Sequence, residues 1–292
     1  MTDTAEPGRI DAHQHFWDIE SGRYDWPTPA QAAIHRTFRP SDLEPELRAS
    51  GIDRTIVVQT VDTLDDTDSM LAAAAANPWI AGVVGWVPLE DVARAEAALA
   101  AWPEAPLRGV RHLIHHEADP DWLVDPRIQP GLELLARRGL AFDVVAVFPD
   151  HLGHVPTIAD RHPNLTLVID HLANPPIRGV GWDDWRSGLE EAARRPNVVA
   201  KLSGLDTAAG PGWTLAELRP SIDVALEAFG PDRLLFGSDW PVCRMVSTYG
   251  EVVGAAIDAV ADLTTAERRA ILGGTAARVY GLHGQPAPDR PA

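Results

Sequence analysis

The sequence of 292 residues is poor in several residue types that particular classes of protein need. Cys243 is its only cysteine, so the chain cannot form an intramolecular disulfide, and a reducing compartment such as the cytoplasm is the expected location. Basic residues are scarce, because 25 Lys and Arg stand against 42 Asp and Glu, which gives a formal net charge of -17. Such a charge repels phosphate backbones and anionic lipid surfaces, so we expect no nucleic-acid partner and no membrane partner.

Long apolar segments are also missing from the sequence. Runs such as Thr55–Val58 and Leu165–Ile169 are too short to span a bilayer, and the N-terminal segment has acidic residues but no apolar run, which argues against a secretory signal. From Gly284 the chain reads GQPAPDRPA, a composition that predicts a disordered tail over residues 284–292. The remaining residues, 1–283, are numerous enough to form one large domain with a single core.

What the sequence does contain is a regular alternation of short apolar runs with Ala- and Leu-rich segments of helical periodicity. The runs predict strands at Arg9–His15, Arg54–Thr60, Ala81–Val87, Gly109–His112, Ala141–Val147, Leu165–His171, Val198–Ser203 and Leu234–Asp239. The intervening segments predict helices at Ser41–Ser50, Asp68–Asn77, Asp91–Ala101, Arg127–Arg138, Pro156–His162, Trp182–Arg194, Leu215–Phe229 and Tyr249–Ala261, with a last helix over Thr265–Tyr280. Because the runs are apolar on successive residues, both faces of each strand should be covered, as in a parallel sheet. Eight such units favour an α/β fold with a single-domain (β/α)8 TIM barrel.

Polar residues collect where these predicted strands end, which is where a TIM barrel holds its reacting groups. His13 and His15 end the first run, and residues i and i+2 of a strand point to the same side, so both imidazoles should face the barrel mouth. Asp239 ends the eighth run, which neighbours the first in a closed barrel. A carboxylate there can act as a general base or as a metal ligand, although an Asp at such a place can also simply cap a helix.

Two other strand ends place a pair of polar residues next to each other. Adjacent residues of a strand point to opposite sides, so His171 is expected in the mouth while Asp170 faces away and orients another group. By the same argument, one of Arg111 and His112 should face inward. The alternative interpretation is that these histidines are structural and only form hydrogen bonds with the nearby backbone. The candidate substrate-binding residues are Arg111, His112, Gln59, Trp86, Trp240 and Trp26. Aromatic faces can stack on the C–H surface of a sugar, although core packing is the commoner role of a tryptophan.

Several segments together form a pattern that is specific to one family. They read IDAHQHFW, VVQTVDT, GWVPLED, RGVRHLIHHEADPDWL, VIDHLANPPI, KLSGL, FGPDRLLFGSDWPVC and GGTAARVYGL. From about residue 9 to residue 282 the chain resembles the amidohydrolase-related family of the amidohydrolase superfamily, in particular its sugar-lactonase branch, which includes enzymes acting on L-fucono- and L-rhamnono-lactones. The resemblance implies a hydrolase of a carboxylic ester that opens the ring of a sugar-acid lactone.

The resemblance also implies roles for individual residues. Asp239 would take a proton from the attacking water, and His13, His15 and His171 would polarise the lactone carbonyl or hold a metal. The pair Arg111-His112 would contribute to substrate binding.

Two departures from the wider superfamily bear on the cofactor. The fourth predicted strand ends in His112 rather than in the lysine that bridges two metals, and the fifth run ends without a histidine. We therefore expect no two-metal site. One zinc-like divalent ion, bound by His13, His15, His171 and Asp239, and no metal at all both stay open, and the resemblance favours the second.

Other functions also stay open at this stage. A metal-dependent decarboxylase or an amide hydrolase of the same superfamily would keep the site and change the reaction. A non-catalytic ligand-binding barrel would be expected to lack the base or the first pair of histidines, and both are present here. A monomer and a homodimer are equally compatible with the sequence.

Overall fold

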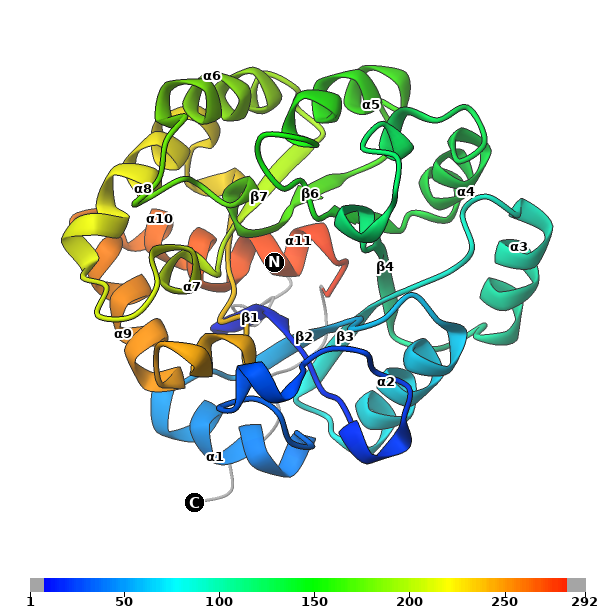
Figure 1. The fold of residues 1–292 in the computed structure, drawn as a ribbon, viewed down its shortest axis with the longest axis horizontal. Helices are drawn as coiled ribbons and strands as arrows, with labels where there is room; N and C mark the ends of the chain where they lie inside the picture. The colour runs from blue at the N-terminus through cyan, green and yellow to red at the C-terminus, as the bar shows by residue number, and fades with distance from the viewer. Residues whose placement is uncertain (1–7, 283–292) are drawn as a thin grey trace, which may run out of the picture.

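The computed structural model describes residues 8–282, so the tail at 284–292 for which the sequence predicts disorder lies outside the described residues. Within that range, eight parallel strands form a barrel in sequence order, as predicted (Figure 1). The strands are β1 (Ile10–Gln14), β2 (Arg54–Val58), β3 (Ile80–Gly85), β4 (Leu107–His112), β5 (Ala141–Val144), β6 (Leu167–Ile169), β7 (Val198–Leu202) and β8 (Leu234–Phe236). The ring closes where Gln14 forms a parallel bridge with Trp240.

Most of the helices surround the barrel on the outside of the strands (Figure 1). They are α1 (Pro40–Ser50), α2 (Leu64–Ala76), α3 (Val92–Ala101), α4 (Gln129–Arg138), α5 (Val155–Arg161), α6 (Trp182–Ala193), α7 (Leu205–Ala209), α8 (Leu215–Phe229), α9 (Tyr249–Ala259), α10 (Thr265–Arg269) and α11 (Thr275–Val279). In residues 8–282 no helix combines the length and the apolar character needed to cross a membrane.

The ends of several helices follow from their sequence. Gly139 ends α4 with a φ of 66°, a left-handed conformation that glycine adopts without steric cost. Thr264 and Glu267 form a capping box at the start of α10. The single helix predicted over Thr265–Tyr280 is instead two short helices joined by a π-helical turn at Ala270–Gly274. The short helix α7 was not predicted, because five residues are too few to show helical periodicity.

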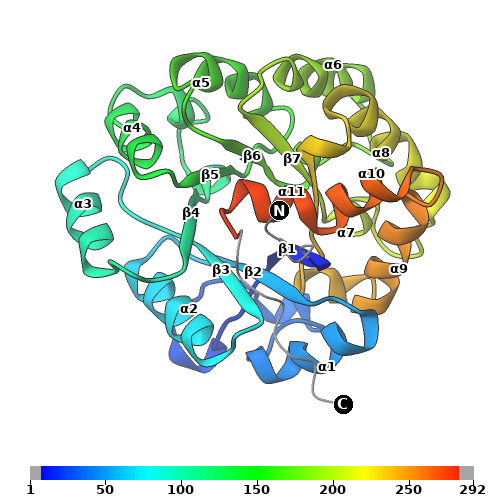
Figure 2. The same cartoon turned by 180° about the vertical axis from the view of Figure 1, so that it is seen from behind.

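The barrel interior has an apolar layer at its N-terminal end and a polar layer above it. Residues such as Ala141, Val168 and Val199 form the apolar layer together with Tyr280, which follows α11. Figure 2 shows the segment from α10 to α11 crossing this end of the barrel. Because a strand repeats every two residues, the positions two residues further along point to the same side. Those positions are Asp143, Asp170 and Lys201, so the interior becomes charged where the apolar layer ends.

Candidate active site

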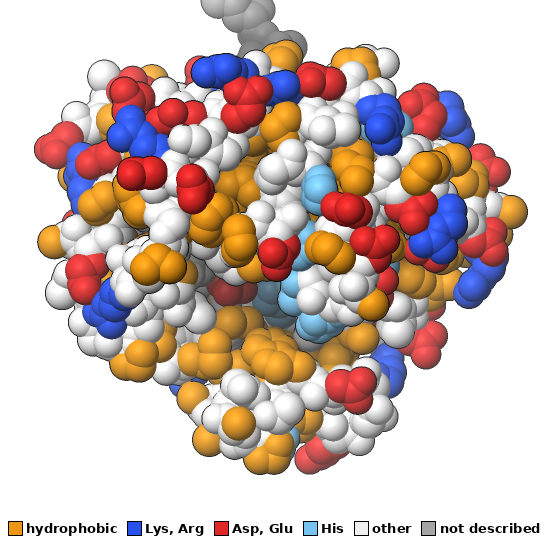
Figure 3. Space-filling view, turned by 45° about the horizontal axis from the view of Figure 1, so that its top comes forward, with side chains coloured by type: hydrophobic (Ala, Val, Ile, Leu, Met, Phe, Trp, Pro, Cys, Tyr) orange, Lys and Arg blue, Asp and Glu red, His pale blue; other side chains and the backbone are white. Residues whose placement is uncertain are grey.

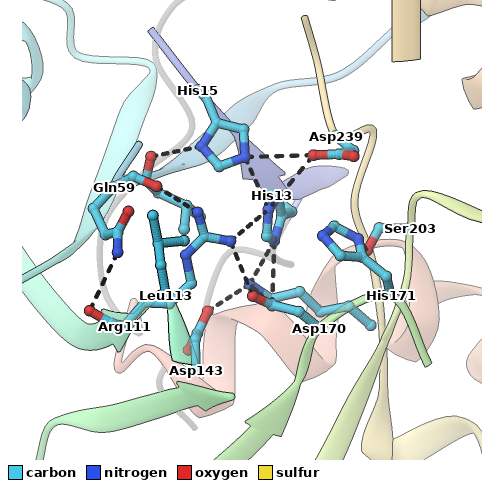
Figure 4. A network of polar contacts seen from close by, with 12 residues as sticks. His13, His15, Gln59, Arg111, Leu113, Asp143, Asp170, His171, Ser203 and Asp239 are labelled. Carbon is cyan, nitrogen blue, oxygen red and sulfur yellow. Dashed lines mark hydrogen bonds and ion pairs between the residues drawn. The ribbon is translucent and has the colours of Figure 1, made fainter. Parts of the chain in front are cut away.

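His13 and His15 lie together at the end of β1, as the i, i+2 spacing predicts. Their Nε2 atoms are 3.1 Å apart and both side chains are buried (Figure 4). The Nδ1 atom of His15 lies 2.8 Å from the carbonyl oxygen of Val58 on β2. A carbonyl oxygen only accepts, so Nδ1 of His15 carries a proton and, in the neutral ring, Nε2 is left as an acceptor toward the barrel mouth.

The segment after β8 brings Asp239 against both histidines. The backbone N–H of Asp239 donates to the carbonyl of His13 at 2.8 Å, and the N–H of His15 donates to the carbonyl of Trp240 at 2.7 Å. Asp239 has a φ of 56°, a left-handed conformation that Asp tolerates better than most residues. Its Oδ1 atom thereby lies 3.4 Å from Nε2 of His15 and 3.6 Å from Nε2 of His13.

Asp170 and His171 follow β6, and both of their side chains lie against His13. Oδ1 of Asp170 is 3.3 Å from Nδ1 of His13, and the ring centroids of His13 and His171 are 4.5 Å apart. The expectation that Asp170 faces away is wrong. Asp170 lies two residues after Val168 and keeps the inward side of the strand. His171 and Leu172 have φ values of 52° and 49°, so the alternation ends at His171 and its ring also reaches His13. Nδ1 of His171 forms a hydrogen bond of 2.8 Å with Oγ of Ser203.

A buried ion-pair cluster lies next to these histidines, inside the barrel. Nζ of Lys201 on β7 is 2.5 Å from Oδ2 of Asp143 on β5 and 3.0 Å from Oδ1 of Asp170. It also lies 3.0 Å from Nδ1 of His13. The hydroxyl of Tyr280 donates to Oδ2 of Asp143 at 2.9 Å. Burying such charges costs several kcal/mol per ion before pairing, so their presence beside the histidines points to a role other than stability.

Arg111 on β4 is the inward-facing member of the pair Arg111-His112. Its Nη1 atom lies 3.2 Å from Oδ2 of Asp170 and 3.5 Å from Nε2 of His13. Its Nη2 atom donates to the backbone carbonyl of Gln59 at 2.5 Å. The guanidinium therefore places a positive charge between the histidines and Asp170, as Figure 4 shows.

Burial determines the charge state of these groups. It lowers the pKa of His15 to about 3, with the charge of Arg111 acting in the same direction. Burial also lowers the pKa of His13 and of His171, so all three rings are neutral at pH 7. Burial raises the pKa of Asp239, although His171 and Arg111 oppose it. Burial would raise the pKa of Asp170 too, but Lys201 and His13 more than offset it and hold that pKa well below its ordinary value.

Four of these residues, His15, Arg111, His171 and Asp239, line a cavity of about 570 Å³ at the barrel mouth. Figure 3 shows histidine side chains gathered in this hollow, with hydrophobic side chains along one side of it. The walls combine apolar residues with polar ones from the loops after the strands. They include Leu113, Val145, Val147, Thr60, Asn174 and Thr207. A cavity of this size and mixed lining is typical of a small-molecule site.

The site also fits one divalent ion. Nε2 of His13, Nε2 of His15 and Oδ1 of Asp239 are 3.1 to 3.6 Å apart, which is the separation of ligands that share an ion at bond lengths of about 2.0–2.2 Å. In a second group, His13 with Asp170 and His171, the ligand atoms also lie within 4.8 Å of one another. However, Asp170 already forms ion pairs with Lys201 and Arg111. Both groups of candidate ligands also include His13.

Comparison with known proteins identifies the family. The family model described as Amidohydrolase matches residues 10–282. The chain belongs to the amidohydrolase family. This assignment agrees with the eight-stranded barrel described above for residues 8–282 and with the position of the polar groups at the strand ends.

Among characterised amidohydrolases, two lactonases are similar to this one. It is 43% identical to an L-fucono-1,5-lactonase of Burkholderia ambifaria over 83% of each chain. It is 39% identical to an L-fucono-1,5-lactonase of Burkholderia multivorans over 94% of this chain and 96% of that one. A crystal structure of a Burkholderia multivorans amidohydrolase with bound zinc is 37% identical, covers 94% of this chain and 99% of that one, and superposes with a TM-score of 0.87. The resemblance inferred from the sequence is thus confirmed.

The structure places only two of the candidate substrate-binding residues in this amidohydrolase at the cavity. Arg111 and Trp26 line it, and Trp26 is 36% exposed. Gln59 and Trp240 lie behind the wall instead. Gln59 donates from Nε2 to Asp62 at 2.7 Å, and Trp240 packs at 5.2 Å between ring centroids against Phe38.

His112 and Trp86 also lie behind the wall, where they support the loop after β4. Nε1 of Trp86 donates to Nδ1 of His112 at 3.1 Å, and the His112 ring stacks on Trp122 with centroids 4.0 Å apart. Nε2 of His112 bonds to Glu117 at 2.7 Å. His115 and His116 of the same loop line the cavity. The contacts of His112 and Trp86 therefore influence the shape of the cavity.

No role for Asp143 or Lys201 was predicted from the sequence, and the structure places both in the barrel interior, where Lys201 contacts His13 and Asp170. A usable signal was present, since each is a charged residue inside an otherwise apolar run, FDVV and VVAKL. Charges at such positions are costly unless they pair, so opposite charges in two strands of one barrel indicate a buried ion pair.

Proposed function

We propose that this amidohydrolase hydrolyses the ring ester of a sugar-acid lactone, with Asp239 as the base that activates water. The observation that carries the proposal is the position of the Asp239 carboxylate at the cavity floor, 3.4 and 3.6 Å from the two Nε2 atoms of His15 and His13. The similarity to two L-fucono-1,5-lactonases supports the choice of a lactone as substrate.

The reaction begins with a water molecule between Asp239 and the lactone carbonyl. Asp239 takes a proton from the water while the water oxygen bonds to the carbonyl carbon, and the carbonyl electron pair moves to its oxygen. Because burial raises the pKa of Asp239, this carboxylate is a stronger base than one in water.

The tetrahedral intermediate carries a negative charge on the former carbonyl oxygen. Groups that stabilise this charge lie around His13. Among them, Arg111 provides a full positive charge, and its Nη1 atom lies 3.5 Å from Nε2 of His13. Such stabilisation by preorganised donors is often the largest single contribution to catalysis. When the intermediate collapses, the bond from the carbonyl carbon to the ring oxygen breaks. Asp239 returns its proton to that oxygen, and the product is the open-chain hydroxy acid.

A divalent ion bound by His13, His15 and Asp239 would supply Lewis-acid polarisation and a more acidic water. Arg111 is not one of these ligands, so it provides its positive charge with or without the ion.

The cavity walls suit a polyhydroxylated ring that also has an apolar edge. Thr60, Asn174 and Thr207 offer hydrogen-bonding groups, while Val145 and Val147 form an apolar wall. Trp26 stands at the mouth, where its face can cover the C–H surface of a sugar.

The test is turnover of a panel of sugar lactones, followed by acid release with a pH indicator. The panel contains L-fucono-, L-rhamnono-, L-galactono- and D-arabinono-lactone, and each is measured with and without prior treatment with a chelator. Turnover of at least one lactone well above its spontaneous hydrolysis supports the proposal, and survival after chelation assigns the work to the side chains alone. Loss on chelation with recovery on added zinc would instead make His13 and His15 ligands. If no lactone is turned over, the proposal is wrong.

A further inference from the structure

Trp26 is the most exposed of the ten tryptophans, and it lines the cavity at the barrel mouth. It lies between two short 3-10 helices, Ile19–Ser21 and Pro29–Gln31, and residues 22–28 form neither helix nor strand. A side chain that must be ordered when a ligand binds costs affinity, and holding it in place beforehand removes that cost. The question is therefore which contacts hold Trp26 at the cavity.

Trp17 supplies an apolar support for the ring of Trp26. The two ring centroids are 5.7 Å apart, and the ring planes meet at 67°. Trp17 is itself buried, and its Nε1 atom donates to the carbonyl of Arg36 at 2.7 Å, so this support is fixed. However, an apolar contact has no strong preference for direction. A directional contact is needed to place the segment that carries Trp26.

Tyr24, two residues before Trp26, makes such a contact. Its hydroxyl donates to Oδ1 of Asp66 at 2.8 Å, and Asp66 is buried in the first turn of α2. Burial and the charge of Asp66 raise the pKa of Tyr24, so the hydroxyl keeps its proton and stays a donor. The other oxygen, Oδ2, accepts from the backbone N–H of Thr60 at 2.8 Å, and Thr60 also lines the cavity. One carboxylate thus joins two segments of the cavity wall.

We propose that Tyr24 is a positioning residue whose hydrogen bond to Asp66 holds Trp26 at the cavity mouth, ready to cover the C–H surface of the sugar ring. The identity of the ligand rests on the proposed lactone hydrolysis. The indole takes no part in making or breaking bonds, so its contact is equally strong in the bound lactone and in the transition state. Loss of such uniform binding raises KM and leaves kcat nearly unchanged.

Arg23 is the competing tether of the same segment. Its Nη1 atom donates to Oγ of Ser69 at 3.1 Å and to the carbonyl of Asp65 at 3.4 Å, and both bonds are exposed. The bond from Tyr24 is shorter, partly buried and directed at an ionised carboxylate, which makes it the stronger of the tethers. We therefore expect Tyr24 to have the larger effect on Trp26.

The first test reads the environment of Trp26 by ¹⁹F NMR of protein that contains 5-fluorotryptophan. The signal of Trp26 is assigned by its loss in Trp26→Phe. In Tyr24→Phe this signal is expected to shift or broaden, because the ring loses its fixed surroundings. Trp102→Phe is the matched control. It removes a hydrogen bond of 2.7 Å from another aromatic ring to Asp68 of the same helix α2, and that bond does not involve the segment of Trp26.

The second test is a double-mutant cycle measured with the best lactone. Trp26→Ala is expected to raise KM about tenfold, and Tyr24→Phe about threefold to tenfold, while kcat stays within about threefold of the wild type. In a protein that already has Trp26→Ala, Tyr24→Phe should raise KM no further, because a residue that acts through the indole has no effect once the indole is gone. Trp102→Phe should leave both parameters unchanged.

An unchanged Trp26 signal in folded Tyr24→Phe would overturn the inference. A rise in KM that persists without Trp26 would do the same, because it would assign the effect to Thr60, and so would a loss confined to kcat. The NMR measurement uses no lactone. If no lactone is turned over, the proposed function fails, and the Trp26 signal still decides whether Tyr24 positions the ring.

Discussion

Gly237, which directly follows β8, packs against the side chain of His13. A Cβ atom at Gly237 would lie 2.6 Å from Cβ of His13 and 3.2 Å from Cβ of Ser203, so this position takes only glycine if His13 is to stay in place. The close approach is what lets Asp239, two residues later, reach both histidines.

Gly237→Ala is therefore expected to displace His13. We expect kcat to fall more than about tenfold and the free energy of unfolding to drop by about 1–3 kcal/mol, the usual cost of overpacking. Kinetics with the best lactone and urea unfolding measure the two effects. Gly254→Ala in α9 is the control, because a Cβ there meets nothing within 4 Å and alanine favours a helix. Equal effects of the two changes would contradict the role given to Gly237.

The pH dependence of activity follows from the raised pKa of Asp239. Burial places that pKa above the ordinary 3.8, and the base works only when deprotonated. kcat/KM should therefore fall as the pH is lowered through this raised value, with a midpoint above 3.8. A pH–rate profile of the wild type measures the midpoint. An acid limb at or below the ordinary carboxyl value would show that Asp239 is not the group that titrates.

The same shift predicts how Asp239 affects stability. A carboxyl group whose pKa is raised on folding binds more protons in the folded state, so it lowers stability as the pH rises through the raised pKa, and the cost is complete above it. Asp239→Asn should consequently be at least as stable as the wild type at pH 7, and its advantage should vanish below pH 3.8. Urea unfolding at both pH values checks this. A variant that is much less stable at pH 7 would mean that the fold needs the charge.

Arg111 is expected to stabilise the fold as well as the reaction, because it neutralises part of the charge of buried Asp170. Arg111→Met should lower the free energy of unfolding by about 3 kcal/mol, since it removes one partner of a buried pair. Arg186→Met is the control at an exposed pair with Glu190, where a much smaller loss is expected because solvent screens the pair. A loss at Arg111 no larger than the loss at Arg186 would show that Lys201 alone suffices for Asp170.

The barrel and the position of the reacting groups could be predicted from sequence because they depend on local periodicity. Apolar runs mark buried strands, and the i, i+2 spacing of His13 and His15 puts both rings on one side. Asp170 was misplaced because the left-handed turn that starts at His171 lets both Asp170 and His171 face the interior, and nothing in the side chains at 170–172 announces that turn.

The partners of Lys201 could not be predicted from local periodicity either, but for a different reason. Asp143 and Lys201 come from β5 and β7, which are not neighbours, so their contact crosses the barrel interior and depends on the relative register of three strands. Likewise, the position of His112 behind the cavity wall depends on its stack with Trp122, which lies in a segment without a periodic signal.

The most direct test of the account compares Asp239→Asn with Asp206→Asn on the best lactone. Asp206 is a buried carboxyl group near Asp239 that bonds to Ser247 and does not line the cavity. Asp239→Asn is expected to keep the fold but to lower kcat by at least about 100-fold, because the general base is lost, whereas Asp206→Asn is expected to stay close to the wild type. A folded Asp239→Asn enzyme with kcat near that of the wild type would contradict the assignment of Asp239 as the base.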